Sequence, residues 1–144
     1  MRPLSLLIVA CLLPGIVIPA KADPEPPTVR GAWVRASLPH EDGTAAYLTL
    51  ESATDDTLTG IGTEAAGMAI LHQTTVKGDL RGMSDVDSVP LPAHHRVVLA
   101  PRGLHIMLMD LKRPLQPGQS VSLTLHFAHA ADLTIAAPVR RTPP

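Results

Sequence analysis

The segment Leu104–Met109 carries one imidazole and two thioethers at alternate positions. On a β-strand, successive side chains point to opposite faces, so His105, Met107 and Met109 would share one face of the strand. Imidazole nitrogen and thioether sulfur are donors that suit a soft metal ion. By itself, however, the segment is more typical of a core strand, because methionine commonly fills gaps in cores and a single histidine usually makes a structural hydrogen bond.

Two further donors lie upstream of this segment. His72 follows the apolar run Met68–Leu71, and Met83 comes after a stretch that contains Gly78 and Gly82. We expect Met83 to lie in a loop that brings its thioether near His72. The complete spacing is His-x10-Met-x21-His-x-Met.

This spacing resembles the ligand signature of the periplasmic PCu(A)C-type copper(I) chaperones. Gln73 and Asp85 depart from the family pattern, since some members carry methionine at these positions, and the His/Met-rich C-terminal extension of some members is missing. These departures argue against an auxiliary copper site but leave the four-residue signature intact. The resemblance covers about residues 30–140 and is carried by Ala32–Ala36, Ala45–Leu50, Asp56–Leu58, Arg102–Leu108 and Leu123–Phe127.

The resemblance implies an all-β, cupredoxin-like Greek-key β-sandwich or barrel that binds one Cu(I) through His72, Met83, His105 and Met107. It further implies a carrier, not an enzyme, that passes periplasmic copper toward the binuclear copper site of cytochrome c oxidase subunit II, with a thioredoxin-like Sco protein as a second partner. The donor set agrees with this function, because uncharged thioethers favour soft Cu(I) over Cu(II) and zinc.

Two other functions remain open at this level. One is an extracytoplasmic β-sandwich module for adhesion or ligand binding, in which histidine and methionine are incidental. The other is a copper-dependent oxidase or oxygenase, which the lack of a third histidine in the spacing disfavours. No Ser/His/Asp order or carboxylate pair stands out in the sequence.

The composition limits the function further. The chain has 144 residues, of which 45% are hydrophobic and 17% charged, so it can form one domain with a buried core. Its single cysteine, Cys11, cannot form an internal disulfide, a Cys-x-x-Cys pair or a thiolate zinc site.

Residues 1–22 have the pattern of a secretory signal peptide, with Arg2 before the apolar stretch Leu4–Ile18 and a small-x-small cleavage site at Ala20–Ala22. Cleavage there would leave a periplasmic chain of 122 residues without cysteine, in which 10 Lys/Arg face 13 Asp/Glu for a net charge of −3. This charge offers no basis for nucleic-acid binding. The apolar stretch is short for a membrane anchor, and it continues beyond Cys11, which disfavours lipid attachment there.

Short apolar runs separated by Gly, Pro and Asp at intervals of about ten residues favour an all-β sandwich or barrel after a linker at 23–29. We expect the domain to cover 30–140 and a tail to follow at 141–144. The alternative is an α+β domain, for which Glu64–Gly67 is the helical candidate. The expected strands are Ala32–Ala36, Ala45–Glu51, Thr57–Gly62, Met68–Val76, Val86–Leu91, Arg96–Ala100, Leu104–Leu111, Val121–Ala128 and Leu133–Val139.

The remaining histidines and methionines are expected to have ordinary roles. We expect solvent exposure for the histidines outside the signature, packing without metal for Met68 and Met109, and structural roles for Trp33 and Arg35. The histidines in question are His40, His94, His95, His126 and His129.

Overall fold

The computed structural model describes residues 20–144 of the chain. The predicted all-β class is confirmed, since the described residues form ten strands and no helix. Of the expected signal peptide, residues 1–19 lie outside the described part, and among residues 20–144 no helix is long and apolar enough to cross a membrane. The strands are β1 Thr28–Arg35, β2 Gly43–Glu51, β3 Asp56–Gly62, β4 Ala66–Lys77, β5 Leu80–Val86, β6 Val89–Leu91, β7 Arg96–Leu99, β8 Leu104–Leu111, β9 Ser120–Phe127 and β10 Leu133–Arg140.

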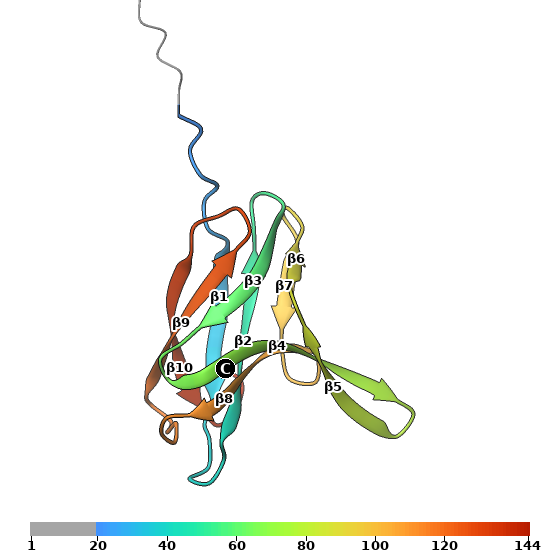
Figure 1. The fold of residues 1–144 in the computed structure, drawn as a ribbon, viewed down its shortest axis with the longest axis vertical. Helices are drawn as coiled ribbons and strands as arrows, with labels where there is room; N and C mark the ends of the chain where they lie inside the picture. Colours follow the sequence, from blue (N-terminus) through green and yellow to red (C-terminus); the bar gives the residue numbers. More distant parts are fainter. Residues whose placement is uncertain (1–19) are drawn as a thin grey trace, which may run out of the picture.

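The strands form two sheets that join at one edge (Figure 1). The first sheet has the order β5-β4-β8-β2-β1, with β7 also paired to β2, and the second has the order β10-β9-β3-β6. The sheets are joined because β1 pairs with β10 in parallel, with Val34 opposite Val139 and Arg35 opposite Arg140. The β4–β5 hairpin extends away from the sandwich (Figure 1).

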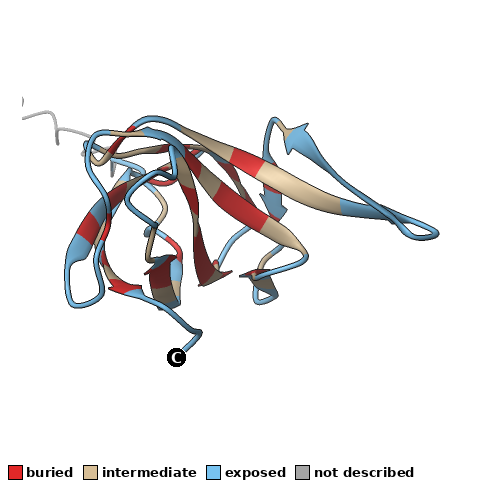
Figure 2. Cartoon of the chain, turned by 90° about the horizontal axis from the view of Figure 1, so that it is seen from below, coloured by how far each residue is buried: buried red, intermediate tan, exposed pale blue. Residues whose placement is uncertain are grey.

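The core lies between the two sheets and follows from strand alternation. In β9 the apolar odd positions from Val121 to Phe127 are buried, as the sequence pattern predicts, while Ser122 is exposed. From the first sheet, Ile106 and Leu108 of β8 are completely buried. Figure 2 shows these buried stretches inside the sandwich, whereas the tip of the β4–β5 hairpin is exposed throughout. One face of the first sheet therefore packs into the core, and its other face is available for a site.

Two expectations about individual elements are wrong. Met83 does not lie in a loop but on β5, which pairs with β4 over seven residues. The expected strand over residues 86–91 is interrupted at Asp87 and Ser88, so that its two ends belong to β5 and β6.

The helical candidate Glu64–Gly67 is instead a bend that leads into β4. The hydroxyl of Thr63 accepts a hydrogen bond from the Ala65 N–H at 3.2 Å, and this local contact stabilises the bend in place of a helical turn. At the N-terminus, β1 begins at Thr28, within the stretch that the sequence pattern assigned to a linker.

Candidate metal centre

The four residues of the signature lie on one face of three adjacent strands. His72 on β4 is directly opposite His105 on β8, and Met107 is two residues further along β8. On the other side of β4, Met83 of β5 is opposite Thr74. Directly opposed residues share a face, and so do residues two apart on a strand. The face that carries all four side chains is the one turned away from the buried Ile106 and Leu108.

His105 is held in a defined orientation. Its side chain is buried, and its ring Nδ1 lies 2.9 Å from the carbonyl oxygen of Gly103. Because a carbonyl oxygen only accepts, Nδ1 donates its hydrogen, and the neutral ring keeps its lone pair on Nε2. A histidine that ligates a metal typically makes this contact with its second nitrogen. His105 is therefore prepared for ligation through Nε2.

His72 has an environment of a different kind. Both of its ring nitrogens are buried, and neither makes a hydrogen bond with any residue among 20–144. Nε2 lies 2.9 Å from Oδ1 of Asp85, which is within ion-pair distance, but the angle does not meet the geometry of a hydrogen bond. Buried polar atoms without partners are rare in folded proteins, so each one calls for an explanation. A metal ligand role for His72 provides one.

The two imidazoles are close enough to share one ion. Their ring centroids are 5.8 Å apart and the rings meet edge to face at 82°. Two imidazoles that bind one ion at about 2.0 Å per nitrogen have centroids roughly 5–6 Å apart. The spacing of His72 and His105 fits this arrangement.

Three residues of the signature line one cavity of about 560 Å³, namely Met83, His105 and Met107. Met83 is 62% exposed, and Met107 is half-buried beside Gly43. His72 does not line this cavity and reaches it only through its contact with the His105 ring. The structure thus brings His105 and the two thioethers together at an open cavity, with the partly buried His72 ring next to them.

The donor types restrict the ion that the face can bind. Among residues 20–144, no three histidine, cysteine, aspartate or glutamate side chains converge in a way that could hold a metal ion. The side chains that line the cavity include the thioethers of Met83 and Met107, and thioether sulfur favours a soft ion such as Cu(I). Tyr47 also lines the cavity, and burial raises the pKa of its hydroxyl while the Arg35 guanidinium partly opposes this effect. The Tyr47 phenol is consequently neutral at physiological pH and supplies no anionic ligand.

Several side chains near the site were not singled out as functional by the sequence pattern, among them Tyr47 and Arg35. Tyr47 stacks on Trp33 with ring centroids 4.7 Å apart, and its ring lies 6.4 Å from that of His105, so this aromatic pair supports the His105 ring. The structural role expected of Trp33 agrees with its burial, but Arg35 lines the cavity together with Arg81 and Arg102. Alternation along β2 places Tyr47 on the same face as Ala45, and Ala45 is directly opposite Met107. The pairing of β2 with β8 therefore brings Tyr47 to the site, and this pairing is visible only in the structure.

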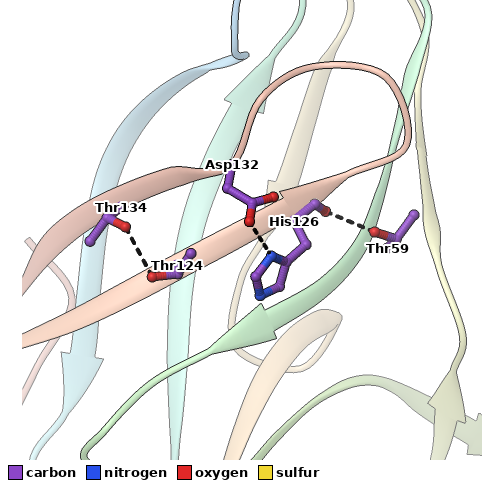
Figure 3. Close-up of polar contacts among 5 residues, drawn as sticks. All are labelled: Thr59, Thr124, His126, Asp132 and Thr134. Carbon is purple, nitrogen blue, oxygen red and sulfur yellow. Dashed lines mark hydrogen bonds and ion pairs between the residues drawn. The ribbon is translucent and has the colours of Figure 1, made fainter.

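None of the histidines outside the signature lines this cavity. His126 lies on the outer face of the second sheet, where its Nδ1 is 2.8 Å from Oδ2 of Asp132 (Figure 3). The backbone carbonyl of His126 accepts a hydrogen bond from the Thr59 hydroxyl, and the hydroxyls of Thr124 and Thr134 form a hydrogen bond with each other nearby (Figure 3). His40, His94, His95 and His129 are exposed, as expected.

Met68 and Met109 do not pack as expected. They are 49% and 38% exposed, and they are directly opposite each other on β4 and β8. Because both have the same strand parity as the signature residues, they extend the same face toward solvent.

Comparison with known proteins agrees with the fold and places the chain among relatives. The LpqE-like family, described as "Putative lipoprotein LpqE-like", matches residues 27–139. A relative from Leifsonia xyli subsp. xyli (strain CTCB07), named "Putative lipoprotein Lxx21020", is 36% identical over 115 residues, which is 78% of this chain and 68% of the relative.

Solved structures share the architecture. The solution structure of CuI-DR1885 from Deinococcus radiodurans is 39% identical with a TM-score of 0.67, over 84% of this chain and 83% of that one. That of apo-DR1885 is 36% identical with a TM-score of 0.63, over 96% and 97% of the two chains. A copper-bound PCuAC domain from PmoF2 has a TM-score of 0.70 over 84% of this chain and 97% of the domain, and at 24% identity it shows the fold alone. The predicted cupredoxin-like β-sandwich is confirmed.

Proposed function

The chain belongs to the LpqE-like family, and from this premise we propose that it is an extracytoplasmic carrier of Cu(I). The ion is bound by His72, Met83, His105 and Met107. The observation that carries this proposal is the shared sheet face, on which a preset imidazole, an imidazole whose buried nitrogens make no hydrogen bond among residues 20–144 and two thioethers occur together. The similarity to CuI-DR1885, which is named as a Cu(I) form, supports the same ion.

Location outside the cytoplasm is part of the proposal. The family and the Leifsonia relative are both described as lipoproteins, and lipoproteins are exported. We assign residues 1–22 to a cleaved signal peptide, residues 23–27 to the segment before the domain and 28–140 to the copper-binding domain in the periplasm, because β1 begins at Thr28. The intact mass of the exported protein distinguishes cleavage after Ala22 from lipid attachment at Cys11, because only the second retains Cys11 and adds acyl chains.

The chemistry of the donors suits a carrier. Two neutral imidazoles and two thioethers contribute no charge, so the bound ion is the only charge of the centre. Among residues 20–144 there is no cysteine, and a site without thiolate holds Cu(I) less tightly than a cysteine-based acceptor does. Transfer of Cu(I) from this face to a cysteine-based acceptor is therefore favourable in free energy, and no catalytic step is involved.

The proposed acceptor is the binuclear copper site of cytochrome c oxidase subunit II, with a Sco-type protein as a second partner. Arg35, Arg81 and Arg102 line the cavity beside the thioethers, and none of them forms an ion pair among the described residues. Free guanidinium groups around a binding site favour a partner with an acidic surface and speed up the encounter with it. We therefore expect the acceptor to present carboxylates around its copper site.

Cu(I) titration of the exported protein in competition with bicinchoninate tests the binding site. The wild-type protein should hold one equivalent, and Met83→Leu, which keeps the volume of an exposed side chain, should weaken binding by about 100-fold because one soft donor is lost. His105→Ala should also weaken it, with circular dichroism confirming the fold. His126→Ala, on the second sheet, is the control. Unchanged affinity in Met83→Leu, or no binding by the wild-type protein, would contradict the proposal.

Transfer to the apo copper domain of oxidase subunit II tests delivery. The wild-type protein should load this domain, and Arg81→Glu should slow loading about tenfold at low ionic strength because electrostatic steering is lost. Arg30→Glu makes the same charge change at an exposed position outside the cavity and should have no effect. If Cu(I) binds but never reaches the domain, the acceptor is wrong while the carrier function stands.

A further inference from the structure

All methionines among residues 20–144 lie on the same face of the first sheet. Met107 and Met109 alternate along β8, Met68 of β4 is opposite Met109, and Met83 is on β5 with the same parity. Starting from the opposed pair His72 and His105, the face continues two residues further to Ile70 and Met107, and then to Met68 and Met109. The thioethers thus extend from the proposed centre toward one end of the two strands.

The outer pair is exposed, although packing would be the ordinary role of methionine. Met68 is 49% exposed and Met109 38%, so neither contributes a fully buried side chain to the core. Directly opposed residues of antiparallel strands have Cβ atoms about 4.5–5.5 Å apart. Two sulfur atoms that bind one ion at about 2.3 Å each are at most roughly 4.6 Å apart, so flexible methionine side chains at this spacing can share an ion.

The inner and outer methionines are also linked through Gly43. A Cβ atom at this glycine would lie 3.2 Å from the terminal methyl carbon of Met107, so the Met107 side chain leans over Gly43. Gly43 is itself directly opposite Met109 across β2 and β8. The end of the Met107 side chain therefore lies near the strand position of Met109 while Met107 also lines the cavity with His105.

We propose that Met68 and Met109 form a second, weaker Cu(I) site, from which the ion passes to Met107 and the proposed centre. This inference extends the proposed function, but the pair would bind a soft monovalent ion even if the histidine centre did not. With two uncharged thioethers and no imidazole, the site excludes zinc and Cu(II), and its affinity is about tenfold or more below that of the four-residue centre. It lies within the sheet and does not depend on a C-terminal extension.

Methionine methyl signals report each site separately. In the exported protein labelled with ¹³C at the methionine methyl groups, Ag(I) serves as a redox-stable probe for Cu(I). The first equivalent should shift Met83 and Met107, and further Ag(I) should shift Met68 and Met109 with a dissociation constant at least about tenfold higher. Zinc added in the same way should shift neither outer signal.

Matched variants separate the two sites. The double variant Met68→Leu and Met109→Leu keeps side-chain volume and should lose the second step while the first is unchanged. Met83→Leu should lose the first step while the second is unchanged. Outer methyl signals that stay in place up to several equivalents, or that move together with the first equivalent, would overturn the second site. An absent first step with a normal outer response would contradict the histidine centre and leave the second site supported.

Discussion

His72 and His105 face each other on neighbouring strands, yet their rings are held in different ways. The Gly103 carbonyl fixes the His105 ring through Nδ1, whereas the His72 nitrogens are buried without a hydrogen bond among the described residues. A buried polar group without a partner costs about 1–3 kcal/mol, and binding an ion recovers that cost. We infer that His105 is the preset ligand and that His72, beside the Asp85 carboxylate, adjusts when copper binds.

At the same scale, Gly43 provides the space that Met107 occupies. In Gly43→Ala the new Cβ would lie 3.2 Å from the Met107 methyl carbon and 3.0 Å from the Leu108 carbonyl oxygen. We expect Met107 to be displaced, Cu(I) affinity to fall by about tenfold and the free energy of unfolding to fall by about 1–3 kcal/mol. Bicinchoninate competition and chemical denaturation measure the two effects.

The control for this variant is Gly60→Ala. There the nearest atom would be His126 Cδ2 at 3.7 Å, which is ordinary contact distance on the second sheet. If Gly43→Ala and Gly60→Ala had the same Cu(I) affinity, the inferred contact between residue 43 and Met107 would not matter for binding.

Among the elements, the β4–β5 hairpin has a special role because it carries Met83. Its strands are joined by the two-residue turn Gly78-Asp79, in which Gly78 has a φ of +59°. A positive φ at the first central residue is typical of a type II′ turn and favours glycine there. Since β5 is almost entirely exposed, the turn and the strand pairing position Met83, with little help from the core.

This dependence predicts an effect of the turn on copper binding alone. Gly78→Val places a β-branched residue at positive φ, which is strained, and should loosen the hairpin and weaken Cu(I) binding about fivefold or more. The melting temperature should change little, because the core does not include the turn. Gly78→Asn is the matched variant, since asparagine tolerates this conformation, and it should bind Cu(I) like the wild-type protein. Equal binding by all three proteins would show that the turn does not position Met83.

In the whole molecule, the site and the stabilising core use opposite faces of the first sheet, so ligands can change with little cost to the fold.

In the second sheet, Asp56 at the start of β3 links this strand to the turn that follows β9. Asp56 is 6% exposed, and its carboxylate accepts hydrogen bonds from the backbone N–H groups of Thr57, His129 and Ala130 at 2.7, 3.0 and 2.9 Å. Burial by itself raises the pKa of Asp56, but these hydrogen bonds to the ionised form outweigh it and leave the pKa below its ordinary value.

The lowered pKa of Asp56 predicts a pH-dependent contribution to global stability. A carboxyl group with a pKa that is lower in the folded than in the unfolded state stabilises the fold above the unfolded pKa, and this contribution is lost as pH falls through the folded value. Asp56→Asn should therefore be less stable than the wild-type protein by about 1–3 kcal/mol at pH 6–7. The difference should begin to shrink below about pH 4, where Asp56 of the unfolded chain becomes protonated, and it should be lost as pH falls through the lower pKa of the folded protein.

Urea denaturation at several pH values measures this difference. Asp55→Asn is the control, because Asp55 is exposed and makes a single hydrogen bond, to the Ala93 N–H. A difference between Asp56→Asn and the wild-type protein that stayed constant from pH 7 to pH 3 would rule out ionisation of Asp56 as its source.

Much of the fold could be predicted because period-two alternation is a local property. The alternation from Val121 to Phe127 predicted both β9 and its buried positions, and seven further expected strands overlap observed ones, although β1 begins at Thr28, before the expected Ala32. The hairpin strand β5 was missed because its side chains are nearly all exposed, which leaves no apolar alternation to detect. For the same reason Met83 was expected in a loop.

The sequence by itself determined the all-β class, the residue types of the candidate centre and the preference of those types for a soft ion, since all of these depend on local pattern and donor chemistry. Only the tertiary structure decided which side chains meet. Strand register places His72 opposite His105 and Met68 opposite Met109, and it brings Asp85 to His72 and the guanidinium groups to the cavity. Register is set by pairing between strands distant in the chain and by the burial of one sheet face, and no spacing within a single strand contains that information.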